Sequence, residues 1–284
     1  PNVWGMTLKA PTANGLDMSA RLGLYTHMNG GENALGNGEI NIRETSGSIA
    51  GSFGTVLVGR SLGIHQSNAI LNDMLLFGVG AGASAGNNNT TLGRIGVGYL
   101  YTDFQPQVSW TLPELGNGFA AKVGIFDPKD VAADTPAISA TDHSAPRVEA
   151  QITWNGDFLQ TGVGVNLWVD GTYQYTGRTL AETQSRQAAA AGSAQLDIEH
   201  DSVDSAGVGF GTKLSYEGFS LVATGFYASG LGMRGQHSVL PIRQVNNAVA
   251  ATTGALDDDG KERKSYGGYI QGTFDFGQGT NVGY

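Results

Sequence analysis

The feature that most constrains the fold is a two-residue alternation of apolar and polar side chains along the chain. It is clearest over 158–175, where Leu, Val and Tyr occupy alternate positions and polar residues such as Asn166, Asp170 and Gln174 lie between them. Successive residues of a β-strand point to opposite faces, so this pattern predicts a strand with one apolar and one polar face. The run is longer than the roughly 5–6 residues of a typical soluble strand and could cross a bilayer at a tilt.

The same alternation predicts strands along the rest of the chain. In 147–154, for example, Arg147 and Glu149 oppose Val148 and Ile152. The other clear runs are 17–25, 104–112, 206–216 and 266–276; weaker ones are 3–10, 53–60, 118–126 and 219–228, and 40–51 is ambiguous. With a final run from Thr280, the sequence predicts about twelve strands and an all-β fold.

The connections between these runs alternate strictly between short and long. The short ones are rich in Gly or Asn-Gly, as tight hairpins require, and lie at 13–15, 51–54, 115–118, 155–157, 217–218 and 277–279. The long ones are polar and lie near 26–38, 61–93, 127–145, 176–204 and 229–264. Short periplasmic turns and long external loops give this rhythm in an antiparallel transmembrane β-barrel, whereas a soluble sandwich has no reason to place every long loop at one end.

Composition agrees with a barrel and excludes several other classes. Charged residues are only 14% of the chain, yet the mean hydropathy is −0.14 and no run of apolar residues is long enough for a transmembrane helix. A barrel reconciles these values because every second residue faces a polar lumen. The absence of Cys excludes disulfides and thiolate metal sites, and the net charge of −9 argues against nucleic acid as a partner.

Aromatic residues gather at the ends of the predicted strands. They are Trp4, Tyr25, Phe53, Phe119, Trp154, Phe158, Tyr216, Phe219 and Phe276. Aromatic girdles at the two membrane interfaces predict this placement. Ordinary packing at hairpin ends is the alternative.

The connection 61–93 differs from the other long ones because part of it is apolar. Residues 67–78 begin with Ser67, a helix N-cap residue, and stop at Gly78, which predicts a short helix. Such a segment is too apolar to extend into water. We therefore expect a loop that folds into the barrel and buries four apolar side chains against the wall, Ile70, Leu71, Leu75 and Phe77.

At this loop the sequence resembles a known family. Residues 51–60, Gly-Ser-Phe-Gly-Thr-Val-Leu-Val-Gly-Arg, resemble the fourth turn and fifth strand of the trimeric porins of Gram-negative bacteria, in which a Gly-Arg pair directly precedes the constriction loop. Residues 93–97 resemble the start of their sixth strand, and 108–113 followed by Gly118-Phe119 resemble its end and turn. The motifs cover about residues 1–126; downstream only the rhythm of turns and loops agrees.

The resemblance implies a single barrel domain over 1–284 that belongs to a sixteen-stranded barrel, entered at strand two and left in strand thirteen. It further implies a homotrimer in the outer membrane, in contact with membrane lipid and lipopolysaccharide, and passive diffusion of small hydrophilic solutes and ions. No enzymatic reaction and no cofactor are implied. Two alternatives stay open: a substrate-selective channel of the same fold for small carboxylates, and a non-conducting surface barrel or adhesin. A soluble β-sandwich enzyme is a more distant one.

In this family, wall arginines face acidic groups on the inward loop. Arg60 and Arg94 match wall-arginine positions, and Arg21 and Arg43 are further members by the face they occupy. The loop 61–93 holds a single acid, Asp73, which implies a more basic constriction and a bias toward anions. The arginines could equally pair with lumen acids, for which the sequence offers two candidates, Glu44 and Glu149.

Three other motifs were weighed as sites. Gly59–Gly63 fits the G-x-S-x-G pattern, but hairpins surround Ser61 where a nucleophile elbow needs a strand followed by a helix, so we expect no catalytic residue. Residues 257–260 resemble the start of a calcium loop, but Gly268 stands where such a loop needs Glu. The five His residues have no metal-ligand spacing, so we expect no metal site.

Overall fold

The computed structural model describes residues 2–26, 40–76, 96–133, 139–189, 201–232, 236, 254–257, 260–277 and 281–283. They form one sheet of twelve antiparallel strands, each paired with its neighbours in sequence, so that β1 and β12 are its edges. The strands are β1 (Asn2–Lys9), β2 (Asp17–Thr26), β3 (Asn41–Gly51), β4 (Gly54–Leu62), β5 (Phe104–Thr111), β6 (Phe119–Phe126), β7 (Arg147–Asp157), β8 (Gly164–Gly177), β9 (Ser202–Tyr216), β10 (Phe219–Ser229), β11 (Lys264–Asp275) and β12 (Asn281–Gly283). The predicted all-β antiparallel fold is confirmed.

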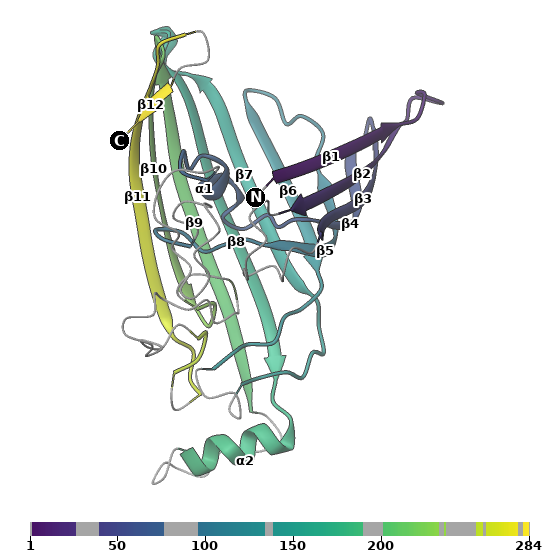
Figure 1. Cartoon of the computed structure of the whole chain (residues 1–284), viewed down its shortest axis with the longest axis vertical. Coiled ribbons are helices and arrows are strands. Elements are labelled where there is room, and N and C mark those ends of the chain that lie inside the picture. The colour runs from purple at the N-terminus through teal and green to yellow at the C-terminus, as the bar shows by residue number, and fades with distance from the viewer. Residues whose placement is uncertain are drawn as a thin grey trace.

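Short and long connections alternate along the meander as the sequence predicts. Short ones join β1 to β2, β3 to β4, β5 to β6, β7 to β8, β9 to β10 and β11 to β12, and the others are long. The long connection after β8 contains helix α2 (Leu180–Ala189), which lies at the end of the molecule opposite β12 in Figure 1. In the β1–β2 turn, Asn14 and Gly15 have φ of 53° and 73°, the left-handed values that a tight hairpin needs.

One predicted turn is wrong. Residues 155–157, expected to be the turn before a strand beginning at 158, are the last residues of β7 and pair with Asn166, Val165 and Gly164 of β8. The turn lies at 158–163, where Leu159 and Gln160 have φ of 51° and 58°. A local Asn-Gly signal competes here with cross-strand pairing, and the pairing extends β7 past it.

Two predicted boundaries around the inward loop also need correction. Helix α1 spans only Ser67–Leu71, and its N-cap is Gln66 rather than Ser67. Ile70 is buried as expected, Leu75 is half-buried, and Leu71 is 60% exposed; Phe77 lies outside the described residues. Residues 96–103 form turns and a bridge, so β5 begins at Phe104 and not near residue 93.

The two faces of the sheet differ as the alternation predicts. On one face apolar side chains are exposed in every strand from β4 to β11, with Val169 56% and Ile270 75% exposed. On the other, polar side chains such as Arg147, Glu149 and Asp170 are buried. Long connections cover that second face, which we call the lumen face. No helix among the described residues is both long and apolar enough to cross a membrane.

Aromatic residues mark the short-turn end of the exposed apolar face. Trp110 and Trp154 donate their indole N–H to the turn carbonyls of Phe53 and Asn117, at 2.8 and 3.0 Å. Phe53, Phe119, Phe158, Tyr216, Phe219 and Phe276 are between 42% and 65% exposed. Tyr25 departs from the expected girdle, because its ring lies beneath the Arg43 guanidinium, 5.1 Å from the ring centre.

Candidate functional site

The segment between β4 and β5 crosses the lumen face and packs against the distant wall. Ala69 and Ile70 of α1 lie in an apolar cluster with Trp168 of β8, Val222 of β10 and Tyr269 of β11. Figure 1 shows α1 over one side of the curved sheet. The predicted inward loop is therefore present in residues 63–76.

Two residues of one wall strand, β11, also fasten this loop through polar contacts. The Tyr269 hydroxyl donates to the Ala69 carbonyl at 2.6 Å and so satisfies a buried backbone acceptor of the helix. The Gln271 side chain accepts from the Met74 N–H and donates to the Asn72 carbonyl, both at 2.9 Å. One amide thus satisfies a donor and an acceptor of the loop, which buried backbone requires.

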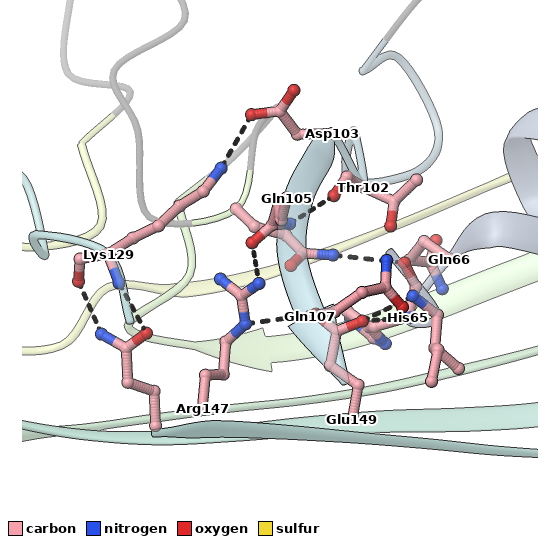
Figure 2. A network of polar contacts seen from close by, with 12 residues as sticks. His65, Gln66, Thr102, Asp103, Gln105, Gln107, Lys129, Arg147 and Glu149 are labelled. Carbon is pink, nitrogen blue, oxygen red and sulfur yellow. Dashed lines mark hydrogen bonds and ion pairs between the residues drawn. The ribbon is translucent and has the colours of Figure 1, made fainter. Parts of the chain in front are cut away.

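The start of the loop is held by two wall carboxylates. Glu149 Oε2 accepts the backbone N–H groups of Ile64 and His65 at 2.6 and 2.9 Å. Asp170 Oδ1 accepts the Gln66 N–H at 3.0 Å and lies 2.6 Å from His65 Nδ1. Figure 2 shows the Glu149 contact, with this side chain beneath His65 and Gln66.

A buried ion pair lies beside these contacts. Arg147 Nε is 3.2 Å from Glu149 Oε1, and both side chains are fully buried. Its guanidinium also donates to Gln105 Oε1 and lies over the Phe126 ring at 5.3 Å (Figure 2). The pair joins β5, β6 and β7 on the lumen face.

A second cluster surrounds Arg43 near the long-loop end. Arg43 Nη1 donates to the Tyr101 hydroxyl at 3.1 Å, and the guanidinium lies over the rings of Tyr25 and Phe104, which contact each other edge-on. Burial raises the pKa of Tyr101 above its ordinary value, which outweighs the opposing effect of Arg43. The phenol therefore stays neutral, and Arg43 has no carboxylate within ion-pair distance among the described residues.

Asp103 and Lys129 link two long connections beside this cluster. Lys129 Nζ is 2.8 Å from Asp103 Oδ2. Burial alone would raise the pKa of Asp103, but Lys129, the Phe104 N–H and Arg43 together lower it below its ordinary value. The charged carboxylate is thus favoured in the folded state.

This link gives a pH prediction. A carboxyl group whose pKa is lower in the folded state adds stability above its unfolded pKa, and this contribution disappears as pH falls through the folded value. We expect wild type to exceed Asp103→Asn in unfolding free energy by a constant amount above about pH 5, and by a vanishing amount well below the ordinary value of 3.8. Both side chains are partly exposed, so the difference should stay under about 1 kcal/mol. Urea titrations of both proteins across pH 3–7 measure it, and a difference that grows in acid contradicts the assignment.

The structure places four of the five predicted pore residues. Arg21 pairs with Glu44 at 2.9 Å, and Arg43 lies on the same lumen face. Asp73 is buried in the inward loop and accepts from the Tyr99 hydroxyl at 3.2 Å. Arg94 lies outside the described residues.

Arg60 lies apart from the others. It pairs with Thr45 and Pro106, in the row next to Val58 and Val108. Paired residues of antiparallel strands share a face, so the register aligns Arg60 with the exposed apolar face rather than with Arg21. Its pore role stays a prediction.

Sequence reasoning missed the residues that hold the loop. Glu149 was noted only as a partner for an arginine, and the partner is Arg147. Asp170 and His65 were left without a role, although they are 105 positions apart and in contact. The signal in the sequence was the alternation of polar and apolar residues in β7 and β8. It predicts that Glu149 and Asp170 face the lumen, but it does not predict which residues they contact.

Five carboxylates around the inward loop and its neighbouring wall are engaged by other groups. Glu44 contacts Arg21, Asp103 contacts Lys129, Glu149 contacts Arg147 and backbone, Asp170 contacts His65 and Gln66, and Asp73 contacts Tyr99 and Leu75. In the Arg21–Glu44 pair, the arginine is 44% exposed and the carboxylate only 11%. The guanidinium is therefore the more accessible member of this pair.

Comparison with solved structures identifies the fold. The outer membrane channel DcaP of Acinetobacter baumannii matches 96% of this chain with a TM-score of 0.58 at 15% identity. OmpT, an outer membrane protein of Vibrio cholerae, matches 97% of this chain and 74% of its own, at 10% identity and a TM-score of 0.42, and the assignment does not depend on it. No protein-family model and no curated protein sequence matches the chain.

This chain spans 62% of the length of DcaP. This chain forms an antiparallel meander in which short and long connections alternate. An exposed apolar face and a polar lumen face complete the agreement with a membrane barrel. The chain therefore has the fold of the outer-membrane porin-type β-barrels of Gram-negative bacteria.

Proposed function

We propose that this chain forms the wall and constriction of a passive outer-membrane channel for small hydrophilic solutes, with a bias toward anions. The observation that carries the proposal is the inward loop 63–76, which is fixed to the lumen face of a membrane-type barrel wall by Glu149, Asp170 and Gln271. A loop held inside a barrel narrows the passage without closing it. Transport then needs no reaction and no cofactor, because a water-filled path lowers the barrier for polar solutes.

The anion bias follows from which charges remain available. The five carboxylates around the inward loop are engaged with partners, whereas Arg43 has only hydroxyl and aromatic contacts among the described residues. Lys122 of β6 pairs in register with Gln151 and so shares the lumen face. Fixed positive charges at a narrow point attract anions and repel cations.

The test is single-channel recording of the full protein in a planar bilayer under a salt gradient. We expect discrete openings whose reversal potential reports a modest anion preference, and openings in groups of three if the protein is a trimer. Conductance that saturates with one carboxylate solute would favour a substrate-selective channel of the same fold. Insertion without any current contradicts the channel function and favours the non-conducting surface barrel.

A further inference from the structure

The first residues of the inward loop, 64–66, dock on the lumen face of three strands, β7, β8 and β9. We call this docking site the socket. Three consecutive backbone N–H groups, those of Ile64, His65 and Gln66, are divided between Glu149 of β7 and Asp170 of β8. Both carboxylates and both loop side chains, His65 and Gln66, are buried to 2% exposure or less. Hydrogen bonds from N–H groups to charged acceptors are shorter and stronger than those to neutral acceptors. These three bonds therefore hold the start of the loop firmly on the wall.

Each carboxylate has its own compensating group, which allows two acids to lie side by side. Glu149 Oε1 is 3.2 Å from Arg147, and Asp170 Oδ1 is 2.6 Å from the His65 ring. Buried carboxylates are stable in a protein interior only when they are paired or hydrogen-bonded, and these two groups supply that partnership in addition to the loop backbone.

The third strand, β9, contributes two glycines whose missing side chains leave space for the loop. A Cβ atom at Gly209 of β9 would lie 1.8 Å from Gln66 Nε2 and 2.7 Å from Asp170 Oδ1, and one at Gly207 would lie 3.0 Å from His65 Nε2. Neither glycine has a left-handed φ, so the backbone does not require them. They leave room for the loop to sit directly on the sheet.

A further contact covers the side of His65 that faces away from the wall. Gln236, in the connection between β10 and β11, donates from Nε2 to the His65 carbonyl at 3.2 Å. Its own N–H donates to the Tyr101 carbonyl at 3.4 Å. His65 is thus enclosed by the wall on one side and by a second long connection on the other.

We propose that Glu149 and Asp170 are positioning residues that hold the inward loop at one height, so that the constriction keeps a single calibre. The docking of the loop is independent of transport, but the statement about calibre rests on the proposed channel function. Because the wall supplies hydrogen-bond acceptors to the loop backbone, the loop stays in one position. It therefore narrows the lumen by a fixed amount and does not move into the remaining passage.

The test uses the absence of Cys from the chain, which makes introduced cysteines unique labelling sites. Spin labels on Leu71→Cys in the loop and Ile152→Cys on the outer face of β7 report loop position; both side chains are about 60% exposed (60% and 58%). We expect a narrow distance distribution in the wild-type background and a broad one in E149Q/D170N. We also expect larger fluctuations of the single-channel current in the same double variant, with the sign of its voltage dependence unchanged.

Asp157→Asn is the matched control, because Asp157 also belongs to β7 and accepts a backbone N–H, that of Gly162 at 3.1 Å, but lies at the opposite end from the loop. It should leave both the distance distribution and the noise unchanged. Gly209→Val enters the socket from the other side and should reproduce the broad distribution. If E149Q/D170N does not fold, the D170N single variant and Gly209→Val supply the same two readouts.

The outcomes separate the two proposals. A narrow distribution in the folded socket variants overturns the socket, even if the wild-type protein conducts as expected. A broad distribution supports the socket, and the absence of current in wild type would then count against the channel function alone. A broad distribution with wild-type noise and conductance overturns the link between socket and calibre.

Discussion

Replacing Arg147 with Met is expected to lower the free energy of unfolding by roughly 3 kcal/mol. The substitution leaves Glu149 buried without its cation, and the surviving N–H bonds from Ile64 and His65 compensate only part of its charge. It also leaves Gln105 Oε1 without its guanidinium donor and removes the contact with Phe126. Urea unfolding in lipid vesicles, followed by tryptophan fluorescence, measures the change.

Two comparisons make this result specific. Arg21→Met breaks an ion pair of similar length whose arginine is 44% exposed, and should cost about 1 kcal/mol or less. R147M/E149Q removes both buried charges and should recover part of the loss, because an unpaired buried charge costs more than a missing pair. A loss for R147M no larger than that for R21M contradicts the buried pair as a determinant of stability.

Arg43→Glu is expected to produce the largest change in ion selectivity. It reverses a charge that lies on the lumen face near the long-loop end, over the rings of Tyr25 and Phe104. A unit charge at 4 Å contributes about 1 kcal/mol in water, so a reversal should shift the anion-to-cation permeability ratio several-fold toward cations. Reversal potentials under a salt gradient report the ratio directly.

The matched control is Lys264→Glu, the same change of charge on the opposite face of the sheet. Lys264 is exposed and two positions from Tyr266, with which it shares the apolar face. Its reversal should leave the permeability ratio at the wild-type value. Equal shifts in the two variants would indicate that the whole charge of the protein, not the lumen position of Arg43, sets selectivity.

Arg60→Glu decides between two expectations for one residue. The resemblance to porins implies that it lines the pore, in which case its reversal shifts the permeability ratio as Arg43→Glu does. The register with Pro106 aligns it with the apolar face, in which case it behaves as Lys264→Glu. The same recording on three variants settles the assignment.

Much of the fold follows from local sequence signals. Alternation in 147–154 predicted that Arg147 and Glu149 face away from Val148 and Ile152, and the structure has this arrangement. Gly and Asn-Gly signals predicted most of the short turns, because left-handed φ values restrict which residues can occupy them. The Asn-Gly signal at 155–156 was wrong, because pairing with β8 outweighed it.

The candidate site could be predicted only in outline. The apolar segment after Arg60 indicated an inward loop, but not that Leu71 would be 60% exposed or that the helix would end there. The two-residue alternation shows which face of the sheet a charged side chain occupies. It contains no information about which distant residue that side chain contacts. The sequence therefore indicated the face of Arg21 and Arg43 and offered Glu44 only as one of two possible arginine partners; the structure pairs Glu44 with Arg21.

By itself, the sequence determined the strands, their two faces and the alternation of turns and loops, because these depend on residues close together in the chain. Only the tertiary structure decided that His65 meets Asp170, that Glu149 holds the loop backbone, and that Gly209 leaves room for Gln66. The first two contacts join positions separated by 84 to 105 residues along the chain, and the third joins positions still farther apart. The inward path of the loop across the curved sheet brings them together, and no local pattern specifies contacts between such distant positions.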